Sequence, residues 1–262
     1  MDKTSLGDRM KEYENVERRY LTRREPTIVR VDGRAFHRFT HDFTRPFDAS
    51  FLACMRATAK DLCENIMGAK FAYTQSDEIS ILLTDDDSIE TQAWFGKNLQ
   101  KIVSVSAAMA TFFFNRNLSC LYFHGLPGED PDGFYFASVG VSRAYAAERL
   151  AVFDARAFVL PREEVNNYFL WRQRDCERNS IQSVAHAFFS QKELIGLSCN
   201  DLQNKLFTER GINWNDYPTA FRRGAAVEKD LNNKWYVNME IPRFNEDRAH
   251  IEDIVYHRGE DE

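Results

Sequence analysis

The chain has few cysteines and no long apolar run, and both shortages exclude classes of protein. Its five cysteines are Cys54, Cys63, Cys120, Cys176 and Cys199. An odd number with no C-x-x-C pair argues against a disulfide framework and against a zinc knuckle. No stretch approaches the roughly 18 consecutive apolar residues of a membrane span, and residues 2–9 are polar where a secretory signal would be apolar. We therefore expect a cytoplasmic protein without a membrane partner.

The chain also lacks an excess of positive charge. Its 34 Lys and Arg residues are outnumbered by 40 Asp and Glu residues, which gives a formal net charge of −6. This balance argues against a polybasic nucleic-acid binder, although it leaves room for a local basic groove. With 262 residues, of which 44% are hydrophobic and 13% aromatic, the chain can form a large core as one domain or two closely packed ones.

Hydrophobic periodicity and turn residues predict alternating strands and helices. Runs rich in β-branched or alternating apolar residues predict strands at 27–31, 71–73, 79–83 and 153–160. Apolar residues at helical spacing predict one helix at 49–66 and another from about 87 to 115. The order is β-α-β-β-α-β.

The remaining segments predict a loop, helices and a hairpin. The Gly- and Pro-rich segment 125–133 is typical of a surface loop. Pro161 followed by two glutamates predicts the start of a long helix that reaches about residue 190, and a shorter helix is expected at 202–210. A last hairpin is expected to turn at Asn232 and Asn233.

Two aspartates stand where chemistry could occur. Asp32 ends the first predicted strand, and Asp77 lies at the tip of the predicted 71–83 hairpin. If these strands are neighbours in one sheet, the two carboxylates share one edge, where their repulsion would favour a cation such as Mg²⁺. Such a site can transfer phosphoryl groups. The alternative, that each Asp only stabilises a turn, stays open at this point.

Longer motifs give the chain a family resemblance. They are Val29 to Phe39, Arg45-Pro46 with Asp48, Ala72 to Ser80, Phe153 to Arg156, Tyr168 to Asp175 and Phe221 to Gly224. In this order they resemble the core motifs of the tRNA-His guanylyltransferase superfamily, which adds nucleotides in the reverse, 3′-to-5′ direction. The catalytic core of that superfamily is a palm with the β-α-β-β-α-β order predicted above.

This resemblance implies the fold class and the organisation of the chain. We expect an α+β protein whose palm-type, ferredoxin-like catalytic core, with an N-terminal extension, occupies residues 1–160. Residues 161–262 would form a C-terminal helical region and hairpin packed on the core. The superfamily also suggests a homotetramer that binds tRNA.

The resemblance assigns site residues position by position. It implies that Asp32 and Asp77 are catalytic and bind two Mg²⁺ ions, with the main-chain carbonyl of Gly33 as a further ligand. It also implies a nucleotide-binding set made of Asp32, Gly33, Arg34, Ala35, Phe36, His37, Arg45, Ser76 and Asp77. The substrates would be ATP and GTP or another nucleoside triphosphate.

Two groups of basic residues have alternative interpretations. Lys97 and Lys101 fall where the superfamily carries residues that hold a triphosphate, but four-residue spacing also fits a solvated helix face. The arginines of the predicted 161–190 helix could bind RNA phosphates or could pair with neighbouring acidic residues; they are Arg172, Arg174 and Arg178.

One departure from the superfamily pattern favours a particular branch. Enzymes that add the extra guanosine to histidine tRNA carry a His-Ile-Asn-Asn-type motif, but this chain has Arg178-Asn-Ser-Ile181. That version resembles the guanylyltransferase-like branch of bacteria and archaea, which repairs truncated tRNA 5′ ends by using the opposite strand as template. The alternatives are non-templated guanosine addition, a palm-type nucleotide cyclase and a non-catalytic RNA-binding protein.

Overall fold

A computed structural model describes residues 4–124 and 138–256 of the chain. The strands are β1 (Thr27–Gly33), β2 (Ala69–Gln75), β3 (Glu78–Leu83), β4 (Phe153–Val159), β5 (Ala225–Lys229) and β6 (Trp235–Asn238). The main helices are α1 (Ser5–Val16), α3 (Ala49–Asn65), α4 (Leu99–His124), α5 (Val139–Ala146), α6 (Arg162–Phe188), α8 (Cys199–Arg210) and α10 (Ala249–Val255). Short helices are α2 (Phe36–Phe39), η1 (Trp94–Lys97), α7 (Gln191–Leu194), η2 (Trp214–Asp216) and α9 (Thr219–Arg223).

One antiparallel sheet organises the molecule. Its strand order is β4-β1-β3-β2-β5-β6, and β1 pairs with β3 and with β4. The first four strands and the helices α3 and α4 follow one another as β-α-β-β-α-β, which confirms the predicted α+β, palm-type fold. The C-terminal hairpin turns as predicted and continues the same sheet, because β5 pairs with β2.

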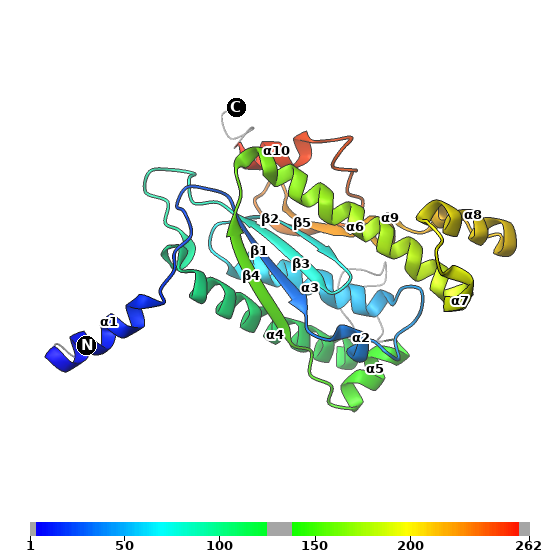
Figure 1. Cartoon of the computed structure of the whole chain (residues 1–262), viewed down its shortest axis with the longest axis horizontal. Coiled ribbons are helices and arrows are strands. Elements are labelled where there is room, and N and C mark those ends of the chain that lie inside the picture. Colours follow the sequence, from blue (N-terminus) through cyan, green and yellow to red (C-terminus); the bar gives the residue numbers. More distant parts are fainter. Residues whose placement is uncertain (1–3, 125–137, 257–262) are drawn as a thin grey trace.

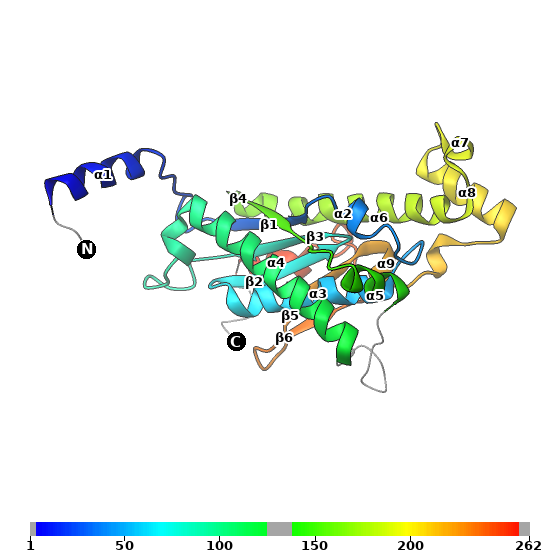
Figure 2. The same ribbon diagram turned by 90° about the horizontal axis from the view of Figure 1, so that it is seen from below.

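Helices cover the two faces of the sheet (Figures 1 and 2), and each face has its own hydrophobic core. Val29 and Val31 of β1 point toward α3 and α4, whereas Ile28 points toward α6 and α10. This alternation follows from the two-residue period of a strand. Arg30 and Asp32 therefore lie on the same face as α6. The helix α1 has no buried residue and projects away from the sheet.

The second long helix begins later than predicted. The sequence pattern placed its start near Asp87, but α4 begins at Leu99. Phe95, Gly96 and Lys97 have positive φ angles, which an α-helix does not tolerate. The Asn98 side chain accepts a hydrogen bond from the Lys101 N–H at 3.0 Å and so caps the true helix start.

Other parts of the fold were not foreseen or lie outside the described residues. The pattern gave no sign of α1, α2 or α5. The loop predicted at 125–133 belongs to the residues that the structure does not describe.

Within the described part of the chain, the helices are too short or too polar to cross a membrane.

Candidate functional site

Antiparallel pairing brings the two predicted carboxylates together where β1 ends and β2 turns into β3. Asp32 lies opposite Glu78, the residue that follows Asp77. The Gly33 N–H donates a hydrogen bond to the Asp77 carbonyl at 3.0 Å, which joins the end of β1 to the turn between β2 and β3. The two aspartates, far apart in the sequence, thus become neighbours as predicted.

The turn that carries Asp77 is tight and strained. Gln75 pairs with Glu78, so only Ser76 and Asp77 connect β2 to β3. Ser76 has a φ of 48°, and Ala35, just before α2 on the other side of the site, has a φ of 55°. Non-glycine residues rarely adopt this left-handed conformation, and it persists only where the surroundings enforce it.

The environment of Asp77 disfavours its negative charge. Burial raises the pKa of Asp77 to about 6, and repulsion from the Asp32 carboxylate contributes to the rise. The Asp32 side chain is 37% exposed and lies 3.8 Å from an Arg156 guanidinium nitrogen. A partly buried pair of carboxylates of this kind is stabilised when a cation or a proton neutralises it.

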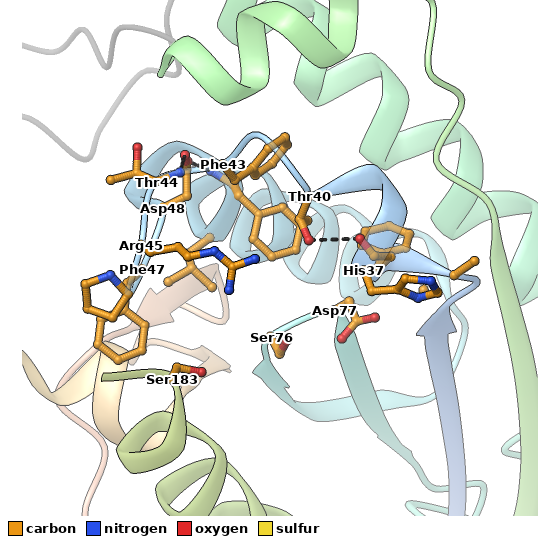
Figure 3. A pocket seen from close by; sticks show the side chains of 16 residues that line it. His37, Thr40, Phe43, Thr44, Arg45, Phe47, Asp48, Ser76, Asp77 and Ser183 are labelled. Atoms are coloured by element: carbon orange, nitrogen blue, oxygen red, sulfur yellow. Dashed lines mark hydrogen bonds between the residues drawn. The ribbon is translucent and has the colours of Figure 1, made fainter. Parts of the chain in front are cut away.

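A cavity of about 510 Å³ opens beside the turn (Figure 3). Seven predicted nucleotide-binding residues line it: Gly33, Ala35, Phe36, His37, Arg45, Ser76 and Asp77. Asp32 adjoins this wall, whereas Arg34 is exposed outside the cavity and its backbone N–H binds the Val152 carbonyl at 2.8 Å.

Sequence reasoning assigned no cavity role to the other lining residues. They are Thr40, Phe43, Thr44, Pro46, Phe47, Asp48, Phe51, Leu52 and Ser183. The segment 40–52 adjoins the quoted motifs, so proximity to Arg45 could have indicated it. Ser183 has no such signal, because α6 reaches the cavity only through the tertiary fold.

Gly33 occupies a position that has no room for a side chain. A Cβ atom on Gly33 would lie 2.3 Å from the ring of Phe36. That ring belongs to an aromatic cluster and lies 5.0 Å from the Phe153 ring. The missing side chain therefore lets α2 pack over the end of β1.

The segment before α3 directs Arg45 into the cavity. The buried Asp48 carboxylate accepts hydrogen bonds from the Phe51 N–H at 2.9 Å, the Thr44 N–H at 3.0 Å and the Ser138 hydroxyl at 2.8 Å. Figure 3 shows the Arg45 guanidinium extending toward the side where Ser76 and Asp77 lie. Arg45 makes no hydrogen bond or ion pair with another described residue. Its charge is thus available to an anionic ligand.

The structure does not bring Lys97 to this site. Lys97 ends η1, and its side chain is 4% exposed. The ammonium group lies 3.1 Å from an Asp85 carboxylate oxygen and donates to the Thr27 hydroxyl at 2.5 Å. Thr27 begins β1, whereas Asp32 stands near its other end. The expectation that Lys97 lies on the second long helix, where it would face a triphosphate or solvent, is therefore wrong.

Lys101 also lies away from the cavity. It is exposed in the first turn of α4, near the beginning of β1, and its ammonium group is 5.9 Å from the centre of the Phe95 ring. This placement fits the solvated helix face that was the alternative to a triphosphate site.

The three arginines of α6 have different surroundings. Arg172 is buried and donates two hydrogen bonds to the Glu78 carboxylate, at 2.8 and 2.9 Å. It also pairs with Asp175 at 2.9 Å, and Arg178 pairs with the same carboxylate. The helical salt bridges are thus present, and the burial of Arg172 contradicts its expected contact with RNA. Arg174 and Arg178 are exposed on α6.

The donors at the sheet edge fit a magnesium site. Asp32 and Asp77 supply hard oxygen ligands, and the raised pKa of Asp77 indicates a carboxylate that a cation would stabilise. The described residues contain no group of three or more His, Cys, Asp or Glu side chains that could hold a metal. Mg²⁺ is suited to such a sparse set, because it takes one or two carboxylates and completes its shell with water and phosphate oxygens.

Comparisons with known proteins agree with this geometry. Residues 7–161 match the family model described as tRNAHis guanylyltransferase. A tRNA(His) guanylyltransferase from Debaryomyces hansenii is 30% identical over 216 residues, which are 78% of this chain and 73% of the relative.

Solved structures show the same similarity. A bacterial tRNA(His) guanylyltransferase-like protein in complex with ATP is 46% identical, with a TM-score of 0.85 over 96% of this chain and 100% of that chain. A second such structure, in complex with GTP, is 43% identical, with a TM-score of 0.77 over 97% and 100%. The Saccharomyces cerevisiae tRNA(His) guanylyltransferase, at 21% identity and a TM-score of 0.65 over 91% and 98%, shares the fold.

The raised pKa of Asp77 predicts a pH-dependent gain in stability for Asp77→Asn. The carboxyl of Asp77 titrates at about 6 in the folded protein and near 3.8 when unperturbed. Its ionisation therefore destabilises the fold progressively as pH rises through this window, by up to about 3 kcal/mol. In the absence of metal, we expect the variant to unfold with a free energy about 1–3 kcal/mol higher than the wild type at about pH 8.

Urea denaturation in the presence of a chelator measures this difference. The gain should shrink as pH falls toward about 4, because the carboxyl is then protonated in both states. Asp154→Asn is the matched control, since that side chain is 58% exposed on the neighbouring strand and should give no comparable gain. An equal gain for Asp77→Asn at both ends of the pH range would contradict the electrostatic explanation.

The position of Lys97 predicts a structural phenotype for Lys97→Met. This change leaves the Asp85 carboxylate, 2% exposed, without its buried ammonium partner. We expect a loss of about 3 kcal/mol in unfolding free energy, as is usual when one partner of a buried ion pair is removed. In the double variant with Asp85→Asn, part of this loss should be restored.

Thermal and urea unfolding measure the loss, and nucleotide titration of the folded protein checks the site. The affinity for a nucleoside triphosphate should stay unchanged. A stable Lys97→Met protein with weakened triphosphate binding would show that Lys97 acts at the nucleotide after all.

Proposed function

The chain belongs to the tRNA-His guanylyltransferase family of nucleotidyltransferases, and from this membership we propose that it repairs truncated tRNA by adding nucleotides to the 5′ end. Addition runs in the 3′-to-5′ direction, with the opposite strand of the tRNA as template. The observation that carries the proposal is the proximity of Asp32 to Asp77 beside a cavity into which Arg45 extends.

Relatives support the choice of small-molecule substrates. The two bacterial relatives of 46% and 43% identity are complexes with ATP and with GTP. We propose ATP as the activating nucleotide and GTP or another nucleoside triphosphate as the nucleotide that is added. The cavity of about 510 Å³ falls within the usual range of about 300–1,000 Å³ for small-ligand sites.

The proposed reaction has two balanced steps. An oxygen of the RNA 5′-monophosphate attacks the α-phosphorus of ATP, the bond to the β-phosphate breaks, and pyrophosphate leaves. The 3′-hydroxyl of the incoming triphosphate then attacks the activated 5′ phosphorus, loses its proton and expels AMP. An RNA that already carries a 5′-triphosphate would skip the first step and release pyrophosphate in the second.

The residues of the site have distinct roles in this proposal. Asp32 and Asp77, with the Gly33 carbonyl, would hold two Mg²⁺ ions, which supply charge neutralisation and a lowered pKa for the attacking hydroxyl. The planar guanidinium of Arg45 can donate two parallel hydrogen bonds to phosphate oxygens. Ser76 and His37 line the cavity and offer polar groups to the nucleotide.

The repair branch is supported by the segment Arg178-Asn-Ser-Ile181. Ser180 and Ile181 are buried, and the Ser180 hydroxyl accepts a hydrogen bond from the Trp214 indole at 3.1 Å. Arg178 and Asn179 are exposed on the same turn of α6. We propose that they face the tRNA with Arg174 and that a homotetramer in the cytoplasm is the working form.

Extension of a tRNA that lacks its first nucleotide tests the proposed function. The added nucleotide should change with the opposing template base when all four triphosphates and Mg²⁺ are present. Asp32→Asn should lower the rate on the order of a thousandfold, because the reaction then loses a metal-binding carboxylate. Sequencing of the product and gel analysis of its length measure both effects.

Each alternative has its own outcome in this assay. Guanosine added whatever the template would indicate the non-templated activity instead. A cyclic nucleotide formed from triphosphate without RNA would indicate a cyclase. RNA binding without any extension, for the wild type as for Asp32→Asn, would indicate a non-catalytic RNA-binding protein.

A further inference from the structure

A buried ion pair lies directly behind the proposed metal site. Arg172 of α6 is 7% exposed, and its Nε and Nη2 groups donate to the two Glu78 carboxylate oxygens at 2.8 and 2.9 Å. The ring of Trp171 lies 4.4 Å from the guanidinium carbon and covers it. A bidentate pair of this kind fixes both the distance and the orientation of its partners.

Glu78 is the structural link between this ion pair and the two aspartates. It follows Asp77 in the chain and stands opposite Asp32 in the pairing of β1 with β3. Its main-chain carbonyl accepts a hydrogen bond from the Thr74 hydroxyl at 3.1 Å, which closes the turn. Movement of Glu78 would therefore displace Asp77 relative to Asp32.

The carboxylate of Glu78 is fully engaged on the α6 side of the sheet. Besides Arg172, it accepts a hydrogen bond from the Ser80 hydroxyl at 3.3 Å and lies 4.0 Å from Arg30. The Tyr168 hydroxyl supports Ser80 at 2.8 Å. Glu78 does not line the cavity. Without Arg172, a third carboxylate beside Asp32 and Asp77 would lose its main neutralising partner.

The contact between Arg172 and Glu78 supports a strained turn. Ser76 adopts a φ of 48°, a conformation that costs free energy and needs support from its surroundings. Arg172 provides a side-chain anchor from α6 to the first residue after that turn, across 94 residues of sequence. Partners of this type, one step removed from a metal, commonly control metal affinity.

We propose that Arg172 is a positioning residue: through Glu78 it holds the Asp77 turn against Asp32 and thereby sets the affinity of the two aspartates for a divalent cation. Arg172 itself contacts neither the cation nor the nucleotide. The inference rests on the proposed function, because it takes Asp32 and Asp77 as metal ligands.

Arg172→Lys tests this inference because it keeps the positive charge and removes the bidentate geometry. The probe is Mn²⁺, titrated into the full chain without nucleotide and followed by the electron paramagnetic resonance of free Mn²⁺. We expect the dissociation constant to rise about tenfold. RNA extension by the variant should recover as Mg²⁺ is raised, a rescue that general structural damage would not give.

Arg162→Lys is the matched control. Arg162 lies on the same helix, pairs with Asp86 and donates to the Val255 carbonyl at 2.7 Å, away from the site. Its substitution should leave the dissociation constant of Mn²⁺ within about twofold of the wild type. Equal weakening by both changes would show that disturbance of α6, and not the link to Glu78, causes the effect.

Glu78→Gln keeps the test decisive if Arg172→Lys does not fold. This change retains the shape of the side chain but removes the charge that Arg172 holds, so Mn²⁺ binding should again weaken. Folded Arg172→Lys or Glu78→Gln protein that binds Mn²⁺ as tightly as the wild type, or more tightly, overturns the inference. A wild type that binds no Mn²⁺ refutes the proposed metal site instead, so the two failures are distinguishable.

Discussion

The central constraint on this structure is that its sheet brings two mutually repelling carboxylates, Asp32 and Asp77, close together. Pairing of β1 with β3 places Asp32 beside the turn that carries Asp77, and burial together with this proximity raises the pKa of Asp77 to about 6. A fold selected only for stability would replace such a pair, since each ionised carboxylate is more stable apart from the other. A cation bound between the two carboxylates would offset this cost, because both carboxylates would then attract the cation.

A buried ion pair lies near each end of β1, one formed by a lysine and the other by an arginine. At one end, Lys97 and Asp85 form a buried pair that fixes η1 to the start of the strand. At the other end, Arg172 neutralises Glu78, which stands opposite Asp32. In contrast, Arg45 has no partner among the described residues and extends into the cavity. Lys97 and Arg172, which are paired, stabilise structure, whereas Arg45 is available to a ligand.

Local sequence predicted the parts of the fold that local physics determines. The period of apolar residues identified β1, α3 and the hairpin of β2 and β3, and the meeting of Asp32 with Asp77 followed from strand pairing alone. Lys97 was misplaced because the segment before α4 adopts left-handed backbone angles that no composition or periodicity reveals. Ser183 was missed because only the packing of α6 brings it to the cavity. Prediction therefore succeeded where apolar periodicity and strand pairing decide the structure, and failed where unusual backbone angles or the packing of a distant helix decide it.

The helix α6 connects these observations, because one element serves the site in two ways. Its middle anchors Glu78 through Arg172, and its later turns place Ser183 in the cavity wall. Any shift of α6 along its axis would thus change the position of the Asp77 turn and the shape of the cavity together. Since packed helices move as units and do not deform continuously, the carboxylate pair and the cavity should keep a fixed relation to each other. Such coupling would suit the proposed reaction, in which the same two aspartates serve two successive phosphoryl transfers.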